Sequence, residues 1–222
     1  MQTYKVLSLL LSYPEAEIQA HGGEMAAILR DECLLPTRHQ EAVIDFLAGF
    51  SNLNLLDAQE QYVALFDRNR SLSLHLYEHV HGETRDRGQA MVQLAELYRL
   101  HGLEIGAHEL PDYLPLFLEF LSFLPAKAAA SLLSEAVHVV AALREKLGKR
   151  DSRYARLLEA VETLAAKAPE KAAVEEALQA LQPEADSLEA LDRQWEEEAV
   201  RFTAARNPNG TDGSGAAASC GR

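Results

Sequence analysis

Apolar side chains recur along most of the chain at the three- and four-residue spacing that places them on one face of a helix. Leu157, Leu158, Val161 and Leu164, for example, would share one side of a helix. Alternation with a period of two, which is typical of a strand, is confined to residues 71–76 and is too short and isolated to form a sheet. The pattern therefore predicts an all-α fold of about ten helices, some of them short. The predicted helices span residues 2–13, 24–31, 38–51, 55–67, 85–101, 111–123, 126–147, 152–167, 170–181 and 187–204.

The domain organisation follows from the same pattern. Residues 1–205 contain no stretch with the length and composition of a linker, so we expect a single helical domain there. Residues 206–222 are rich in Asn, Gly and Ser and offer little to bury, which predicts a disordered tail. The longest apolar run, residues 113–125, contains a glutamate and is shorter than the roughly 20 residues that span a membrane. We therefore expect no membrane insertion and a cytoplasmic protein.

The charge of the chain restricts the classes of partner that it can bind. Its 222 residues carry a net charge of −13, which argues against nucleic-acid binding because that needs a basic surface. The charge is unevenly placed. Residues 67–101 hold five arginines, five acids and four of the eight histidines, whereas residues 170–198 hold ten acids and two bases. The acidic C-terminal helices are therefore interpreted as a solubilising surface, and the neutral middle of the chain as the region of a candidate site.

Cysteine content and motifs give little support to catalysis. Cys33 and Cys220 are too few for a disulfide framework or a four-thiolate metal site. The sequence has no nucleophile elbow, phosphate-binding loop, dinucleotide-binding glycine motif or zinc-protease motif. No cofactor and no catalytic residue is predicted.

A cluster of histidines leaves one enzymatic alternative open. His75 and His79 would share a face of a helix, but His81 would not join them. Together with Glu78 or Glu83 they could make a helical, metal-dependent hydrolase. The simpler interpretation is an ordered connection in which histidine and arginine side chains satisfy helix ends and buried carboxylates.

The segment 110–121 combines a predicted helix start with an unusual carboxylate. Pro111 suits the first turn of a helix, and Asp112 is favoured there by the helix dipole. Glu119 lies among apolar residues, where a carboxylate normally needs a partner. One interpretation is a core helix whose Glu119 pairs with an arginine of the middle segment. The other is one wall of a groove that accepts an amphipathic peptide helix.

Four blocks of the sequence resemble a known family. They read YVALFDR at residues 62–68, SLSLHLYEHVHG at 71–82, RDRGQAM at 85–91 and LPDYLP at 110–115. In this order and spacing they resemble the NarJ/NarW type of molybdenum-cofactor assembly chaperones, the delta subunits of respiratory nitrate reductase. This type belongs to the wider TorD/DmsD family of redox-enzyme maturation chaperones. The resemblance covers roughly residues 4–125, and Tyr113 stands where the wider family tends to carry a histidine.

The resemblance implies a non-catalytic, cytoplasmic chaperone. Such proteins bind the N-terminal segment of the apo catalytic subunit while the molybdenum cofactor and an iron–sulfur cluster are inserted, and they delay its docking on the membrane anchor. Proteins of molybdenum-cofactor biosynthesis are possible further partners. A structural subunit of a larger complex is a third interpretation, and it predicts association with the mature rather than the apo partner.

A peptide-binding site can be placed on this expectation. It requires an apolar groove with a charged rim that fixes the orientation of the bound helix. The residues expected to line the groove are Tyr62, Phe66, Tyr113, Leu114 and Phe117. Those expected at the rim, or bracing it from behind, are Arg70, Arg85, Arg87, Asp112 and Glu119, with His75 completing the set. Because histidine titrates near neutral pH, peptide affinity is expected to depend on pH.

Overall fold

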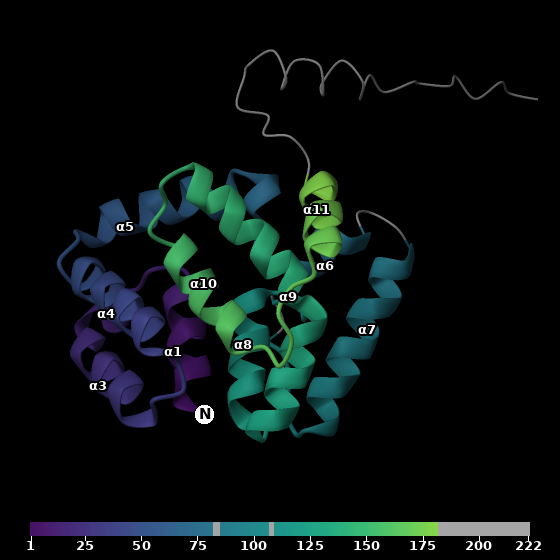
Figure 1. Cartoon of the computed structure of the whole chain (residues 1–222), viewed down its shortest axis with the longest axis horizontal. Helices are drawn as coiled ribbons and strands as arrows, with labels where there is room; N and C mark the ends of the chain where they lie inside the picture. Colours follow the sequence, from purple (N-terminus) through teal and green to yellow (C-terminus); the bar gives the residue numbers. More distant parts are fainter. Residues whose placement is uncertain (82–84, 107–108, 182–222) are drawn as a thin grey trace, which may run out of the picture. The chain divides into compact units, whose positions relative to one another are not determined.

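The computed structural model describes residues 1–81, 85–106 and 109–181, without the side chains of residues 80, 81, 85 and 86 (Figure 1). The chain divides into two units, Met1–Glu184 and Ala185–Arg222, and every described residue belongs to the first. The predicted helix 187–204, the predicted end of the domain at residue 205, the tail 206–222 and Cys220 all lie outside the described residues.

Helices make up most of the described part of the chain, and that part contains no extended strand. The all-α fold class predicted from the sequence is therefore confirmed. The helices are α1 (Gln2–Leu11), α2 (Ala16–Ala20), α3 (Gly22–Glu32), α4 (Thr37–Ser51), α5 (Leu55–Tyr62), α6 (Leu76–His81), α7 (Arg85–Leu100), α8 (Leu114–Phe123), α9 (Ala126–Lys149), α10 (Ala155–Thr163) and α11 (Lys171–Ala180). A π-helical turn, η1 (Val63–Asp67), continues α5, and a 3-10 turn, η2 (Arg70–Leu72), follows it.

The bounds of α1, α3, α4, α7, α9 and α11 agree with the prediction to within two residues, whereas α10 is three to four residues shorter at each end than the predicted helix 152–167. Two short helices were missed. α2 and α6 have five and six residues, which is too few to show a helical period. The predicted start of α8 at Pro111 is wrong, because the helix begins at Leu114 with Pro115 in its first turn. Residues 111–112 form a turn instead, closed by a hydrogen bond from Tyr113 N to the Leu110 carbonyl (3.1 Å), and this turn is used to build the candidate site.

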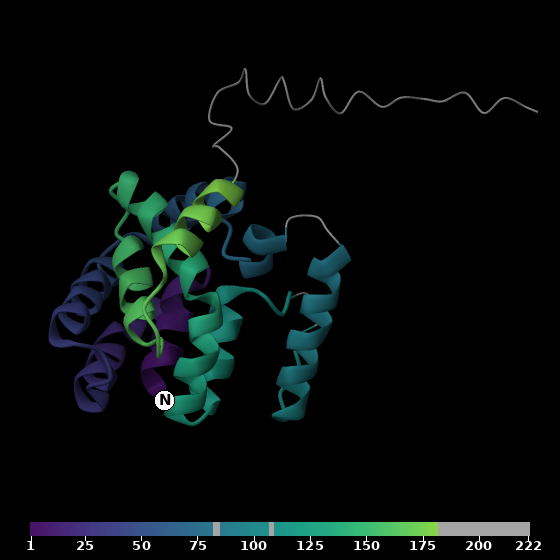
Figure 2. The same ribbon diagram turned by 45° about the vertical axis from the view of Figure 1, so that its right-hand side comes forward.

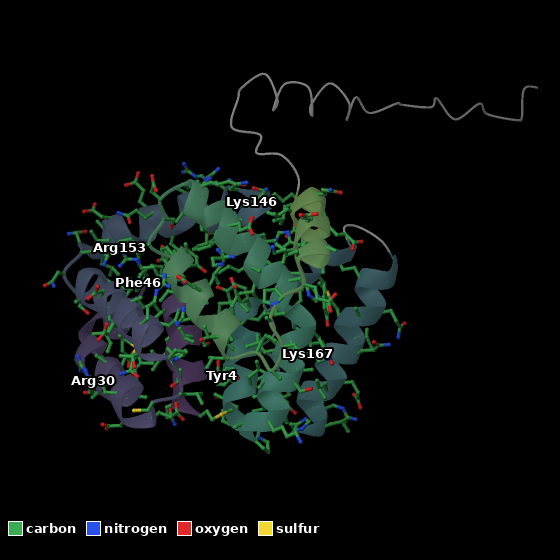
Figure 3. All side chains as sticks on the ribbon, in the orientation of Figure 1. Tyr4, Arg30, Phe46, Lys146, Arg153 and Lys167 are labelled. Carbon is green, nitrogen blue, oxygen red and sulfur yellow. The ribbon has the colours of Figure 1, made fainter. Side chains whose placement is uncertain are left out.

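The core forms around α1 and α9. Helix α1 packs against α8, α3 and α10, while α9 packs against α10 and α11; Figures 1 and 2 show α1 and α8 side by side. Tyr4 of α1 is 2% exposed, and its hydroxyl donates to the Leu164 carbonyl at the end of α10 (3.3 Å). This burial raises the pKa of Tyr4 to about 12. Arg30, by contrast, lies exposed on α3 (Figure 3).

One described helix, α9, is long and apolar enough by length and composition to cross a membrane, with a mean hydropathy of 1.4 over 18 residues. Core helices of proteins outside membranes pass the same test. Leu133, Val140 and Leu143 of this helix are fully buried within the described chain. We therefore interpret α9 as a core helix.

Candidate functional site

The candidate site is built where the chain before α6 runs beside the chain before α8. His75 and Tyr113 form an isolated antiparallel bridge there. Two backbone hydrogen bonds hold the segments together, one from Leu114 N to Leu74 O (2.8 Å) and one from Leu76 N to Asp112 O (3.0 Å). Of residues 71–76, which show the period-two pattern, 71 and 72 belong to η2 and 76 begins α6, so the extended contact is the single bridge at His75.

Asp112 is fully buried at the centre of this contact. Its Oδ2 accepts a hydrogen bond from Tyr77 N (3.1 Å), and its Oδ1 accepts one from His75 Nδ1 (3.3 Å). The Tyr77 amide belongs to the first turn of α6, which has no partner of its own within that helix. Asp112 therefore caps α6. The sequence had placed it in the first turn of the following helix instead, and that prediction is wrong. A buried carboxylate with these two donors meets the requirement that buried charge be hydrogen-bonded.

Two tyrosine hydroxyls join the N-terminal helices to this contact. Tyr62 Oη donates to the Leu11 carbonyl (3.0 Å) and lies 2.8 Å from Tyr113 Oη. Because the single Tyr62 proton points at Leu11, Tyr113 donates to Tyr62. Burial raises the pKa of both tyrosines, so both hydroxyls stay protonated at neutral pH. The ring of Tyr13 packs edge-on against Tyr62, with 5.7 Å between the ring centroids.

A cleft of about 600 Å³ opens beside Tyr113 between that residue and helices α1–α3. We call it the acidic cleft. Its apolar lining residues are Leu9, Tyr13, Ile18, Met25 and Tyr113. Its polar lining residues are Ser12, Glu15, Glu17, His21 and Glu109. A hydrogen bond to the Glu17 carbonyl and the charge of Glu24 raise the pKa of the exposed His21. The cleft thus pairs an apolar floor with three carboxylates.

The structure brings some of the predicted groove residues together and buries most of them. Tyr62 and Phe66 pack ring to ring, with centroids 4.9 Å apart, and both are buried. Leu114 is fully buried and Phe117 is 4% exposed. Tyr113 is the half-buried member of the five and the one that lines the acidic cleft. The other four support the surface from inside, and their part in peptide binding stays a prediction.

The predicted rim residues are spread over several contacts. Arg70 Nε donates to Glu78 Oε1 (2.8 Å) at the start of α6. Glu119 pairs with Lys5 of α1, so the expected arginine partner is wrong. Arg87 is half-buried, and its Nε finds no hydrogen-bond partner in the described part of the chain. The side chain of Arg85 lies outside the described residues.

The histidines of the middle segment do not form a metal site within the part of the chain that is described. His75 is paired with Asp112, while the buried His79 donates from Nε2 to the Ser73 carbonyl (2.6 Å). Burial lowers the pKa of His79 and keeps it neutral. Among the described residues no three His, Cys, Asp or Glu side chains are grouped to hold a metal. The side chains of His81 and Glu83 lie outside them, and nothing described supports the hydrolase alternative.

Residues of the first three helices are the part of the site that sequence reasoning missed. The sequence predicts helices over 2–13 and 24–31, which contain Leu9 and Met25, and predicts no helix over the segment with Glu15, Glu17 and Ile18. A signal was nevertheless present, because Tyr13 and Pro14 are followed directly by Glu15 and Glu17, with the apolar Ile18 next. An exposed aromatic residue beside clustered acids is typical of a binding surface with an apolar floor and a charged rim.

Comparison with known proteins finds one matching family and several related chains. The family described as "Nitrate reductase delta subunit" matches residues 34–160. Over 199 residues the chain is 44% identical to "Nitrate reductase molybdenum cofactor assembly chaperone NarJ" of Escherichia coli (strain K12), covering 90% of this chain and 84% of the relative. It is 38% identical over 202 residues to "Probable nitrate reductase molybdenum cofactor assembly chaperone NarW" of the same strain, covering 91% and 84%. A probable NarJ of Bacillus subtilis (strain 168) is 32% identical over 156 residues, covering 70% and 84%.

Proposed function

Because the chain belongs to the nitrate reductase delta subunit family, we propose that it is a chaperone for the assembly of a molybdenum-containing nitrate reductase. The observation that carries this proposal is its 44% identity, over 90% of its length, to a relative named as such a chaperone. The chain binds the N-terminal segment of the apo catalytic subunit in the cytoplasm, while the molybdenum cofactor and an iron–sulfur cluster are inserted. It leaves before that subunit docks on its membrane anchor.

The acidic cleft and Tyr113 are the proposed contact surface for this segment. A bound amphipathic helix would place its apolar side chains on Tyr13, Met25 and Tyr113 and its basic side chains near the cleft carboxylates. The hydrogen-bonded Tyr62 and Tyr113 hydroxyls fix the position of the Tyr113 ring before binding. A surface fixed in advance loses less side-chain entropy when a peptide binds. The predicted rim residue Asp112 contributes by holding this surface together from inside.

The chain needs no catalytic group for this function. Holding a partner in an open state requires burial of apolar surface and charge complementarity, and no bond is made or broken. Proteins of molybdenum-cofactor biosynthesis are proposed as further partners, which would meet the catalytic subunit while the chaperone holds it. A structural subunit would instead remain with the finished enzyme.

Calorimetry with the full chain tests the proposal. The titrant is a synthetic peptide of the N-terminal segment of the catalytic subunit from the same organism, and a scrambled peptide of equal composition is the control. We expect one peptide per chain and a dissociation constant of ~1 μM or below. No heat of binding at several tens of times that concentration would overturn the proposal. Purification through the chaperone should enrich the cofactor-free catalytic subunit, whereas enrichment of the loaded enzyme would favour a structural subunit.

A further inference from the structure

A second cavity, of about 220 Å³, lies between α8 and the chain that follows α7. Apolar side chains make up most of its lining, and they belong to Tyr98, Leu103, Ile105, Leu116, Phe120 and Phe123. Its charged lining residues are Glu104, Glu109 and Glu119. Glu109 also lines the acidic cleft, so the two spaces adjoin at this residue. We call the second space the α8 cavity.

A stripe of four residues leads from the acidic cleft to the α8 cavity along α8. Its members follow one another at spacings of three, three and four residues, which places them on one side of the helix: Tyr113, Leu116, Glu119 and Phe123. The first three are half-buried and Phe123 is 64% exposed, so the stripe is accessible to a partner. At about 1.5 Å per residue the stripe is roughly 15 Å long, which matches about ten residues of a bound helix.

A stripe on α1 forms the other wall of this surface. Its half-buried residues lie four and three positions apart, and they are Lys5, Leu9 and Ser12. Lys5 pairs with Glu119 at one end of the contact between α1 and α8. Ser8 Oγ donates to the Pro115 carbonyl (2.7 Å), so the two helices, which Figure 2 shows side by side, run antiparallel. The last two residues of the α1 stripe line the acidic cleft, and Glu119 lines the α8 cavity, so the surface leads from one space to the other.

The size and charge of the α8 cavity suit a side chain of the same partner better than a separate small molecule. Its volume is below the range of roughly 300–1,000 Å³ that is typical of small-molecule sites. Glu104 and Glu109 are exposed at its edge, while Glu119 already has Lys5 as its partner. The two exposed carboxylates continue the negative charge of the acidic cleft, which favours a partner that carries basic residues along its whole contact.

We propose that the α8 cavity is a second anchor site for the catalytic-subunit peptide, which extends from the acidic cleft along the stripes of α1 and α8. An apolar side chain of the peptide enters the cavity and contacts Leu116 and Phe123, and a basic side chain one helical turn away lies near Glu104. This inference rests on the proposed chaperone function, because it assigns a longer contact to the same peptide. A peptide confined to the acidic cleft would leave Phe123 exposed in the complex.

Calorimetry with the catalytic-subunit peptide and variants of the full chain tests this assignment. Phe123→Ala removes an exposed side chain, so the variant should fold like the wild type, and we expect it to weaken peptide binding about ten-fold. Leu116→Ala should weaken binding about three-fold or more, and Glu104→Lys should do the same at low salt. Circular-dichroism melting shows whether each variant is folded. Wild-type affinity of both Phe123→Ala and Glu104→Lys would overturn the proposal.

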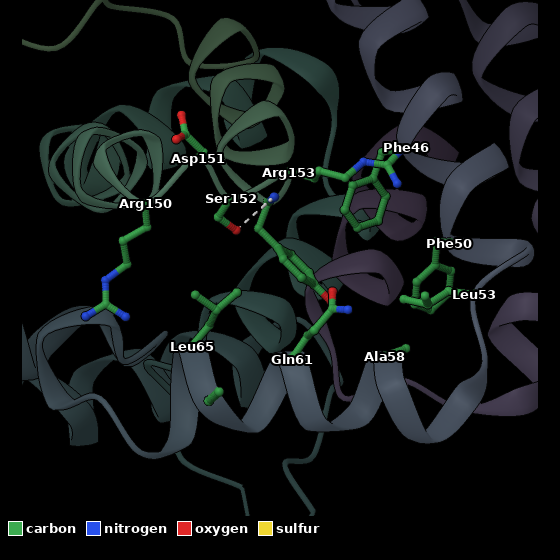
Figure 4. A pocket seen from close by; sticks show the side chains of 12 residues that line it. Phe46, Phe50, Leu53, Ala58, Gln61, Leu65, Arg150, Asp151, Ser152 and Arg153 are labelled. Carbon is green, nitrogen blue, oxygen red and sulfur yellow. Dashed lines mark hydrogen bonds between the residues drawn. The ribbon is translucent and has the colours of Figure 1, made fainter. Parts of the chain in front are cut away.

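Matched controls make the same kinds of substitution elsewhere on the chain. Leu56→Ala removes an apolar side chain of α5 that is 72% exposed, and Glu175→Lys reverses an exposed charge on α11. Leu53 is half-buried, as Leu116 is, and lines a separate pocket of about 370 Å³ between α4, α5 and the turn that joins α9 to α10 (Figure 4). None of the residues that line this pocket lines the acidic cleft or the α8 cavity. Leu53→Ala, Leu56→Ala and Glu175→Lys should therefore keep the peptide affinity near the wild-type value.

Nuclear Overhauser effects in the wild-type complex give a measurement that needs no variant. Protons of the peptide should lie close to the methyl groups of Leu116 and Ile105, as well as to those of Ile18 in the acidic cleft. If the peptide contacts Ile18 alone, and Ile18→Ala alone weakens binding, the second anchor site is absent while the proposed chaperone function stands. If the wild-type chain binds no peptide, the proposed function and this inference fail together.

Discussion

Asp112 caps helix α6 from 35 residues away, because its Oδ2 accepts the hydrogen bond of Tyr77 N at 3.1 Å. Replacing Asp112 by Ala leaves the buried Tyr77 amide and His75 Nδ1 without an acceptor. We expect Asp112→Ala to lower the free energy of unfolding by about 1–3 kcal/mol. Asp112→Asn keeps one oxygen for the Tyr77 amide and should cost less. Urea unfolding of the three proteins checks this order, and equal stability of wild type and Asp112→Ala would contradict it.

The hydrogen bond between Tyr62 and Tyr113 predicts that removing one hydroxyl destabilises the fold more than removing the other. Tyr113→Phe removes one hydrogen bond and leaves the bond from Tyr62 to Leu11 intact, so we expect a loss of about 0.5–1.5 kcal/mol in the free energy of unfolding. Tyr62→Phe leaves both the Leu11 carbonyl and the Tyr113 hydroxyl without their partner and should cost more. A double-mutant cycle measures the coupling between the two residues. Independent effects, or a larger loss for Tyr113→Phe, would show that the hydroxyls do not share the bond described.

Helix periodicity predicted most of the fold but could not assign partners across it. α4, α7 and α9 are long enough to repeat their apolar face several times, and their bounds follow from the sequence. The start of α8 was misplaced because Pro111 and Asp112 read as a helix beginning, whereas the carboxylate serves another helix. Local signals describe a capping residue but do not say which helix it caps.

The candidate site was only partly predictable for the same reason. The segments around His75 and Tyr113 were singled out by composition, and the structure brings them together in one bridge. Lys5 lies 114 residues from Glu119, so no local pattern could prefer it over the nearer arginines. The acidic cleft depends on how α1, α2 and α3 meet, and tertiary packing of this kind leaves no period in the sequence.

Burial of His79 predicts that stability falls in mild acid. Its pKa is lowered in the folded chain, so the unfolded chain binds the proton first as the pH drops below about 6.5. This contribution is constant above about pH 7.5 and declines below, with a slope of at most about 1.4 kcal/mol per pH unit. The charge of nearby Glu78 raises the pKa of His79 and so opposes the effect of burial, whereas the charge of Lys146 lowers this pKa further.

Urea unfolding at about pH 8 and pH 6 measures the dependence. His79→Gln should remove this part of the slope, whereas the exposed His101→Gln should keep it. Identical slopes for wild type and His79→Gln would assign the acid sensitivity to other groups.

The pair of Lys5 and Glu119 predicts a small and salt-sensitive contribution. Their side chains are 34% and 39% exposed, so water screens the attraction. We expect Glu119→Gln to cost about 0.2–1 kcal/mol of unfolding free energy at low salt, and less at high salt. Thermal melts at two salt concentrations check this. A loss of several kcal/mol that ignores salt would instead indicate a buried ion pair.

The carboxylates of the acidic cleft predict how the catalytic-subunit peptide is recruited. Glu15 and Glu17 are exposed at its edge, and charges in such positions act mainly on the association rate. We expect the double substitution Glu15→Lys, Glu17→Lys to slow peptide association about ten-fold or more at low salt and to flatten the salt dependence of the rate. Stopped-flow fluorescence with a labelled peptide measures both.

A matched control and a substitution in the cleft floor separate charge from contact area. The double substitution Glu175→Lys, Glu176→Lys changes the net charge by the same amount on α11, away from the cleft, and should leave the rate near the wild-type value. Ile18→Ala trims the apolar floor and should raise the dissociation rate, because less apolar surface is buried in the complex. If the α11 double substitution slows association as much as the cleft substitutions do, the effect belongs to net charge. If Ile18→Ala leaves dissociation unchanged, the peptide binds elsewhere.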